Sequence, residues 1–204
     1  SAARPGSAGL PTRLAALLRP ASSSDLRCFA LRQLSRIGGD SEIPAIASQI
    51  NAAGDDEHGS CSTMALYALQ RLPGAAADQA LIAALPKAGA QSAAVAAVLG
   101  YRQTRAAVPA ISKLLNAPEH AAAAATALGQ IGGSDAARAL LTALAPSAAP
   151  LPVLLGLIEL IDSISGDEQA AVAQAVLDHP AATPSLRGSA IIGLSQARGN
   201  AALP

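Results

Sequence analysis

The residues best suited to metal or acid–base chemistry gather in one short segment, GDDEHGS. Its potential ligands are Asp55, Asp56, Glu57 and His58. Four consecutive side chains cannot all face one ion without a specialised loop, and the segment lacks the alternating oxygen ligands and the glycine of an EF-hand. A solvated turn that places negative charge before a helix N-terminus explains it better. We therefore assign it no metal ligand.

The sequence offers no other catalytic arrangement. It contains no nucleophile–base motif, no phosphate-binding glycine loop and no zinc-ligand spacing. Its two cysteines, Cys28 and Cys61, form neither a disulfide framework nor a metal motif. We therefore assign no catalytic residue, cofactor-binding residue or cofactor, and expect a protein that is not an enzyme.

The composition limits the fold that could position any site. Of the 204 residues, 51% are hydrophobic, 1% are aromatic and 14% are charged, and the net charge is zero. Alanine dominates the hydrophobic fraction and buries little area per residue, which favours thin layers of closely packed helices. The zero net charge gives no bulk attraction to nucleic acid or to an anionic membrane. No hydrophobic run reaches the ~18–20 residues that span a bilayer, and no signal peptide is visible, so the localisation stays open.

A recurring helix ending indicates an internal repeat. In TALGQIGGSD a helix ends at Gly132 and Gly133, and we take Leu128 as its reference position. The full set of reference positions is Leu34, Leu69, Leu99, Leu128, Ile161 and Leu194. Their successive spacings are 35, 30, 29, 33 and 33, with an average of 32. Apolar residues recur three positions before the reference and twelve and sixteen after it, so the agreement predicts a repeat.

Each repeat is predicted to consist of two amphipathic helices around a glycine-rich break. No stretch alternates long enough to indicate a strand. Because a two-helix unit cannot bury its own apolar face, the units must stack, and we expect an all-α, right-handed α-solenoid. The expected units cover residues 23–53, 57–86, 89–116, 118–145, 150–178 and an incomplete 181–204, after a partial second helix at 10–19.

Residues 121–144, AAAAATALGQIGGSDAARALLTAL, resemble the short bacterial HEAT-like repeat that also occurs in phycobilin lyases. Further pieces of the pattern are Arg27 and Arg187, seven residues before a reference position, and Pro44 and Pro109, ten after one. The resemblance covers the chain as one domain, residues 1–204, and implies an armadillo-like fold. It implies little about function, because this repeat serves many unrelated tasks. The excess of Arg over Lys, 12 to 2, together with the alanine content suggests a bacterium with a GC-rich genome.

Enzymatic relatives of this repeat provide an alternative. Deoxyhypusine hydroxylase resembles this class of repeat and binds two irons through His-Glu pairs at helix starts. Here the order is reversed, at Glu57-His58 and Glu119-His120, and the two pairs lie at different distances from their reference positions. Only the repeat itself points to bilin lyase activity, and no distinctive pocket chemistry is visible in the sequence. A role as accessory or regulatory domain of a larger enzyme is the alternative that we retain.

Nucleic-acid binding is a further alternative. HEAT-like solenoids that resemble DNA glycosylases use a basic concave surface, which second helices usually line. Here these helices offer Arg105, Lys113 and Arg138. They also carry the acidic residues Glu42, Asp78, Asp135, Asp167 and Glu168. Because affinity for DNA rests largely on neutralised phosphates, three basic residues in a neutral chain support only weak binding.

Two departures from the repeat are candidate protein interfaces. The third unit lacks the Gly-Gly pair and places Tyr101, Arg102 and Arg105 at the corner between its helices, where a solvated turn is the simpler interpretation. The first helix of the fifth unit is apolar on nearly all sides. Its additional apolar residues are Leu151, Val153, Leu155 and Leu160. Such a helix is usually buried on all sides, so either the segment APSAAPLP or a partner covers it.

The sequence therefore predicts a non-enzymatic scaffold that binds another protein or the remainder of its own polypeptide. Apolar core residues recur at fixed positions of the repeat, whereas residues that could perform chemistry do not. This contrast supports the interpretation. The chain begins at a second helix and stops as another begins, so we expect it to be a segment of a longer protein.

The repeat makes Leu128→Ala far more damaging than Asp56→Ala in the acidic segment. A buried Leu→Ala substitution typically costs ~2–5 kcal/mol, whereas exposed charge changes stay within ~0.5 kcal/mol. Thermal melts of both variants test this. Equal destabilisation would mean that the acidic segment is a structural or metal site.

Overall fold

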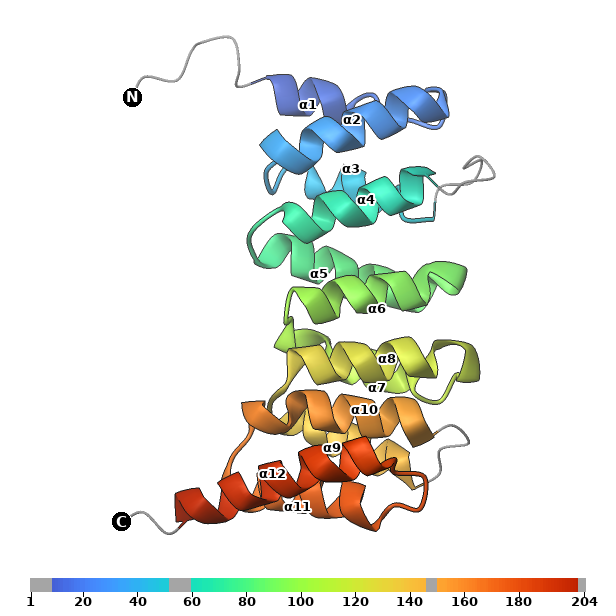
Figure 1. Ribbon diagram of the computed structural model, residues 1–204. Helices are drawn as coiled ribbons and strands as arrows, with labels where there is room; N and C mark the ends of the chain where they lie inside the picture. The colour runs from blue at the N-terminus through green and yellow to red at the C-terminus, as the bar shows by residue number, and fades with distance from the viewer. Residues whose placement is uncertain (1–8, 52–59, 146–149, 202–204) are drawn as a thin grey trace, which may run out of the picture. The chain divides into compact units, whose positions relative to one another are not determined.

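Figure 1 shows the computed structural model of the chain, which describes residues 9–51, 60–145 and 150–201. Every regular element in these ranges is a helix, and the ranges contain no strand. The all-α class expected from the sequence is therefore confirmed. The chain divides into two compact units, Ser1–Val95 and Ala96–Pro204, which are described in turn.

The first unit is built from helices that pack in pairs. They are α1 (Leu10–Ala15), α2 (Ser24–Ile37), α3 (Ile43–Ala47), α4 (Ser60–Arg71), α5 (Ala75–Ala84), two 3₁₀ turns (Leu85–Lys87 and Gly89–Gln91) and the start of α6 (Ser92–Tyr101). The helix α2 packs against α1 and α4, while α3 packs against α4 and α5. The reference residues Leu34 and Leu69 are fully buried between these helices. Their burial follows from the apolar stripe on each helix, which faces the neighbouring helix.

The second unit continues with the rest of α6. Its further elements are a 3₁₀ turn (Arg105–Ala107), α7 (Val108–Leu114), α8 (Pro118–Ile131), α9 (Gly133–Leu144), α10 (Pro150–Leu160), a 3₁₀ turn (Ile161–Ser163), α11 (Gly166–Asp178) and α12 (Pro184–Ala201). The helix α8 packs against α7, α9 and α10, and α11 packs against α12. Leu99 and Leu128 are fully buried, whereas Ile191 on α12, which the repeat placed in the core, is 58% exposed.

Prolines and glycines set the helix boundaries. Pro44, Pro109 and Pro118 lie in the first turns of α3, α7 and α8, where a missing N–H leaves no intrahelical hydrogen bond unmade. Gly132 (φ 67°) ends α8 and starts α9 at once, in a conformation that favours glycine. The amide of Gly133 donates to the hydroxyl of a serine in the turn after α10, at 2.8 Å. The Gly-Gly pair is thus the sharp corner between two helices.

The two arginines of the repeat pattern, Arg27 and Arg187, both form hydrogen bonds with neighbouring segments. Arg27 is buried, and its Nη1 donates to Oε1 of Gln49 at 3.4 Å. The amide of Gln49 donates in turn to the carbonyl of Leu18 at 3.0 Å. Arg187 donates from Nε to the carbonyl of Ala182 and from Nη2 to that of His179, both at 3.2 Å. These bonds satisfy carbonyls at helix ends.

Glycines bring successive first helices of the second unit into close contact. A methyl group added at Gly100 would lie 2.8 Å from Cα of Ala127. One added at Gly129 would lie 3.0 Å from the carbonyl oxygen of Gly156 and 3.1 Å from Cβ of Glu159. These distances are shorter than ordinary van der Waals contacts, so a side chain at either glycine would require the neighbouring helix to shift. The backbones of α6, α8 and α10 approach one another closely at these points.

The same contacts define the equivalent positions on α8 and α10. Gly100 meets Ala127 between α6 and α8, and Gly129 meets Gly156 between α8 and α10. The second pair lies 29 positions after the first, so Leu157 is the equivalent of Leu128. The reference position that we expected, Ile161, is wrong by one helical turn. Leu157 is fully buried in α10, and Ile161 lies in the 3₁₀ turn that follows. The expected spacing included the residues of the 3₁₀ turn between α10 and α11. This shifted the expected reference position from Leu157 to Ile161.

Substitutions of Gly129 and Gly188 should have opposite effects on stability. Alanine favours a helix over glycine by about 0.5–1 kcal/mol, and nothing lies near an added methyl group at Gly188 in α12. We expect Gly188→Ala to stabilise by that amount. Gly129→Ala should instead destabilise by about 1–3 kcal/mol, because its methyl group overlaps α10.

Urea unfolding followed by circular dichroism measures both changes. Gly188→Ala is the matched control for helix propensity. A Gly129→Ala variant as stable as the wild type would show that the close contact between α8 and α10 is not present.

Candidate functional site

An open groove lies between α7 and α9 and has a volume of about 720 Å³. Its lining residues are Arg105, Ala106, Val108, Pro109, Ser112, Leu115, Asn116, Asp135, Arg138, Ala139, Thr142 and Ala143. Small side chains from both helices leave the space open. The proline that starts α7 adds no N–H to the groove wall.

The charged groups of this groove come from its two helices. Arg138 donates from Nη1 to Oδ1 of Asp135 at 3.2 Å, within α9. Both side chains are mostly exposed, so this ion pair contributes little to stability. The hydroxyls of Ser112 and Thr142 donate to carbonyls one turn earlier in their own helices. The donors left for a ligand are therefore mainly the guanidinium groups of Arg105 and Arg138.

The three basic residues expected on the second helices are only partly brought together. Arg105 and Arg138 line the same groove. Lys113 is exposed in the last turn of α7 but is not among the lining residues. The groove therefore carries two cations and one carboxylate, which is a mixed surface rather than a basic one.

A second, polar pocket of about 670 Å³ lies at the C-terminal ends of α6, α8 and α10. It is lined by Gly100, Tyr101, Gln103, Arg105, Gly129, Gln130, Ile131, Gly132, Glu159, Asp162 and Ser163. Tyr101 is 69% exposed, whereas Arg102 is half-buried and does not line the pocket. Desolvation by burial beside α8 raises the pKa of the Glu159 carboxyl above its ordinary value. Since the folded state favours the protonated form, ionised Glu159 opposes folding slightly at neutral pH.

The four candidate interface residues of the fifth repeat divide into buried and exposed side chains. Val153 and Leu160 are buried, with 2% and 0% exposure, and belong to the core. The helix α10 contacts α8, α9, α11 and α12, so neighbouring helices cover a wide arc of its surface. Leu151 and Leu155 are 44% and 53% exposed and form the outward side. Residues 146–149 of the APSAAPLP segment lie outside the described residues, so its role as a cover stays a prediction.

The structure gives no support to a metal site in the residues that it describes. The acidic segment with Asp55, Asp56, Glu57 and His58 lies outside them. Glu119 is exposed and His120 half-buried in the first turn of α8. Across residues 9–51, 60–145 and 150–201, no three His, Cys, Asp or Glu side chains are grouped to hold a metal ion.

One functional candidate was missed in the sequence. A smaller groove of about 290 Å³ between α2 and α4 is lined by Arg32, Ser35, Arg36, Tyr67 and Arg71. The signal was available, because four of these residues stand two positions before or after Leu34 and Leu69. This cluster follows the repeat, whereas the interfaces predicted from the sequence are departures from it.

The chain matches no model of a protein family, and no curated protein matches it significantly. Among the described helices, none combines the length and the apolar character that crossing a membrane requires.

Aspartate substitutions at a buried and at an exposed position of α10 should differ strongly in their effect on stability. Leu160→Asp buries a charge among four helices and should cost at least about 3–5 kcal/mol, enough to unfold the second unit. Leu155→Asp should change stability by less than about 1 kcal/mol, because its side chain is largely in water.

Thermal melts of the two single variants make the comparison, with Thr126→Asp on α8 as a control for a charge on an exposed helix surface. An unfolded Leu155→Asp would place that leucine in the core as well.

Proposed function

We propose that the chain is a non-catalytic scaffold, a right-handed α-solenoid of HEAT-like repeats, that binds a segment of another protein in the groove between α7 and α9. The observation that carries this proposal is the groove itself. It is open, it is lined mainly by small side chains, and charged residues of both signs lie along it.

The helix order supports the repeat interpretation. First and second helices alternate along the chain near the expected positions. Equivalent small residues join α6 to α8 and α8 to α10. Such nearest-neighbour packing is typical of repeat proteins, which use an extended row of second helices as a binding surface.

The lining chemistry favours a peptide over nucleic acid. A peptide main chain needs donors for its carbonyls and an acceptor for its N–H groups, and Arg105, Arg138 and Asp135 supply these. Ala139 and Ala143 leave space for apolar side chains. Nucleic acid would instead need a row of cations without a carboxylate among them. Lys113 does not extend the pair of arginines into such a row.

Selection from a random peptide display library tests the proposal, followed by anisotropy titration of a selected, fluorescein-labelled peptide. Ala139→Trp fills the groove, and the double variant Arg105→Glu with Arg138→Glu reverses the charge of exposed side chains without touching the core. We expect each to weaken binding at least about tenfold, equivalent to about 1.4 kcal/mol.

Matched controls lie outside the groove. Ala171→Trp places the same ring on the exposed side of α11, and Arg19→Glu with Arg198→Glu makes the same charge change elsewhere. Both should bind as the wild type does. The proposal fails if no peptide is enriched, or if the groove variants bind as tightly as the controls. Arginine-dependent binding of a DNA oligonucleotide that is tighter than any peptide would favour the nucleic-acid alternative instead.

A further inference from the structure

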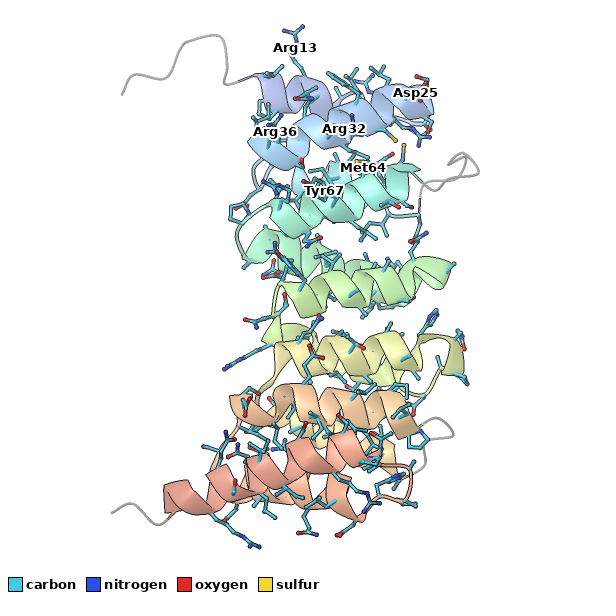
Figure 2. The ribbon with its side chains drawn as sticks, viewed as in Figure 1. Arg13, Asp25, Arg32, Arg36, Met64 and Tyr67 are labelled. Atoms are coloured by element: carbon cyan, nitrogen blue, oxygen red, sulfur yellow. The ribbon has the colours of Figure 1, made fainter. Side chains whose placement is uncertain are left out.

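The groove between α2 and α4 concentrates positive charge in a small space. It has a volume of about 290 Å³ and is lined by Arg32, Ser35, Arg36, Tyr67 and Arg71. Figure 2 shows Arg32 and Arg36 on α2, with Tyr67 on the adjacent α4. All of these residues belong to the first unit, and α2 and α4 pack directly against each other.

Helix geometry explains why these side chains meet. Two residues along an α-helix turn the side chain by roughly 200°, so positions two before and two after a buried residue share the outward side. Leu34 is buried on α2, with Arg32 and Arg36 at those positions. Tyr67 and Arg71 stand in the same relation to Leu69 on α4. The core leucines thus align the four side chains across the contact between the helices.

The three guanidinium groups have no carboxylate in the groove. The only acidic residue of α2 is Asp25, in its first turn at the other end of the helix, as Figure 2 shows. The helix α4 contains no acidic residue. Asp40, which follows α2, is not among the lining residues. Within the described residues, none of the three arginines forms an ion pair.

Fold stability accounts for only part of this charge. Arg36 and Arg71 lie in the last turns of α2 and α4, where a cation complements the helix dipole. Arg32 lies one turn earlier, and like charges four residues apart destabilise a helix slightly. The arrangement is therefore better explained by an anion that all three side chains contact.

Contacts within the groove orient its walls. The guanidinium carbon of Arg71 lies 5.6 Å from the ring centroid of Tyr67, a cation–π distance that restricts the arginine. Ser35 is buried, and its hydroxyl donates to the carbonyl of Arg32 at 2.8 Å. The floor of the groove is therefore small and already hydrogen-bonded, and the guanidinium groups remain as the donors.

We infer that the groove between α2 and α4 binds the phosphate group of a phosphate monoester. A guanidinium group matches the oxygens of phosphate in a bidentate manner. A monoester carries a charge of about −1.5 to −2 at pH 7, which three arginines balance better than they balance one carboxylate. The ring of Tyr67, 42% exposed, provides an apolar surface for the organic part of the ligand. This inference is independent of the groove between α7 and α9.

The dimensions of the site disfavour nucleic acid as its main ligand. Strong binding to a polyanion needs many phosphate contacts along a strand, on the order of 6–10. Here the cations gather around one groove of about 290 Å³, which suits a single phosphate group. An isolated monoester should thus bind at least as well as an oligonucleotide.

Isothermal titration calorimetry at low ionic strength tests this with the whole chain. The probes are phenyl phosphate, N-acetyl-phosphoserine amide, adenosine monophosphate and inorganic phosphate. We expect saturable, one-to-one binding of at least one monoester, and their order distinguishes a phosphorylated side chain from a nucleotide. Tightest binding of inorganic phosphate would overturn the assignment to a monoester.

Charge-neutralising variants locate the binding site. Arg32→Gln and Arg71→Gln should each weaken monoester binding at least about tenfold, while thermal melts stay unchanged because both side chains are exposed. Tyr67→Phe should retain binding, since a phenyl ring preserves the contact with Arg71. Arg198→Gln, an exposed arginine on α12, is the control for net charge and should change affinity less than about twofold.

Three results would overturn the inference. They are the absence of saturable binding by every monoester, an equal loss in Arg198→Gln, and tighter binding of a single-stranded oligonucleotide that depends on the same arginines. Binding that survives both Arg32→Gln and Arg71→Gln would place the ligand elsewhere on the protein.

Discussion

The close contact of helix backbones at small residues is the constraint on which the second unit depends. At Gly129 the space for a side chain is already occupied by the backbone of α10 at Gly156, and Gly100 meets α8 in the same way. Glycine weakens a helix by about 1 kcal/mol relative to alanine. The close approach offsets this cost through many additional van der Waals contacts. A chain with 1% aromatic residues has few other ways to fill a core.

This way of packing also determines where chemistry can lie. Buried positions are occupied mainly by Ala, Leu, Ile and Val, so the space between first helices has little room for reactive side chains. The larger openings occur where helices are short or carry small residues outward, as at Pro109 and Ala139 between α7 and α9. The proposed ligand contacts therefore come from side chains on exposed helix surfaces and at helix corners.

The all-α class and several buried positions could be predicted from the periodic spacing of apolar residues. The buried leucines Leu34, Leu69, Leu99 and Leu128 recur with the helices that they anchor, and the glycine pair at Gly132 ends a helix as expected. The prediction failed on α10, because a 3₁₀ turn lengthens the corner after it and several leucines could serve as the reference. Periodicity alone cannot choose between Leu157 and Ile161, since both lie on the same side of a continuous apolar run. The choice required the contact with Gly129.

The same reasoning explains why Val153 and Leu160 were assigned to the wrong class. A sequence shows that a helix is apolar on most sides, but the number of helices around it is a tertiary property. The helix α10 has four neighbours, and its outward side narrows to Leu151 and Leu155. The groove between α2 and α4 was not predicted for a different reason. Its residues follow the repeat, so they do not stand out as departures from it.

Positions two before and two after Leu34, Leu69, Leu128 and Leu157 are largely turned away from the core by helix geometry. In the second unit these positions hold residues as different as Thr126, Gln130, Leu155 and Glu159. Packing tolerates this variety, so it cannot by itself explain why the equivalent positions on α2 and α4 hold three arginines and a tyrosine. The inferred phosphate site offers a reason for these residue types on α2 and α4. In a protein whose core is made of a few small residue types, information about function is concentrated on these outward positions.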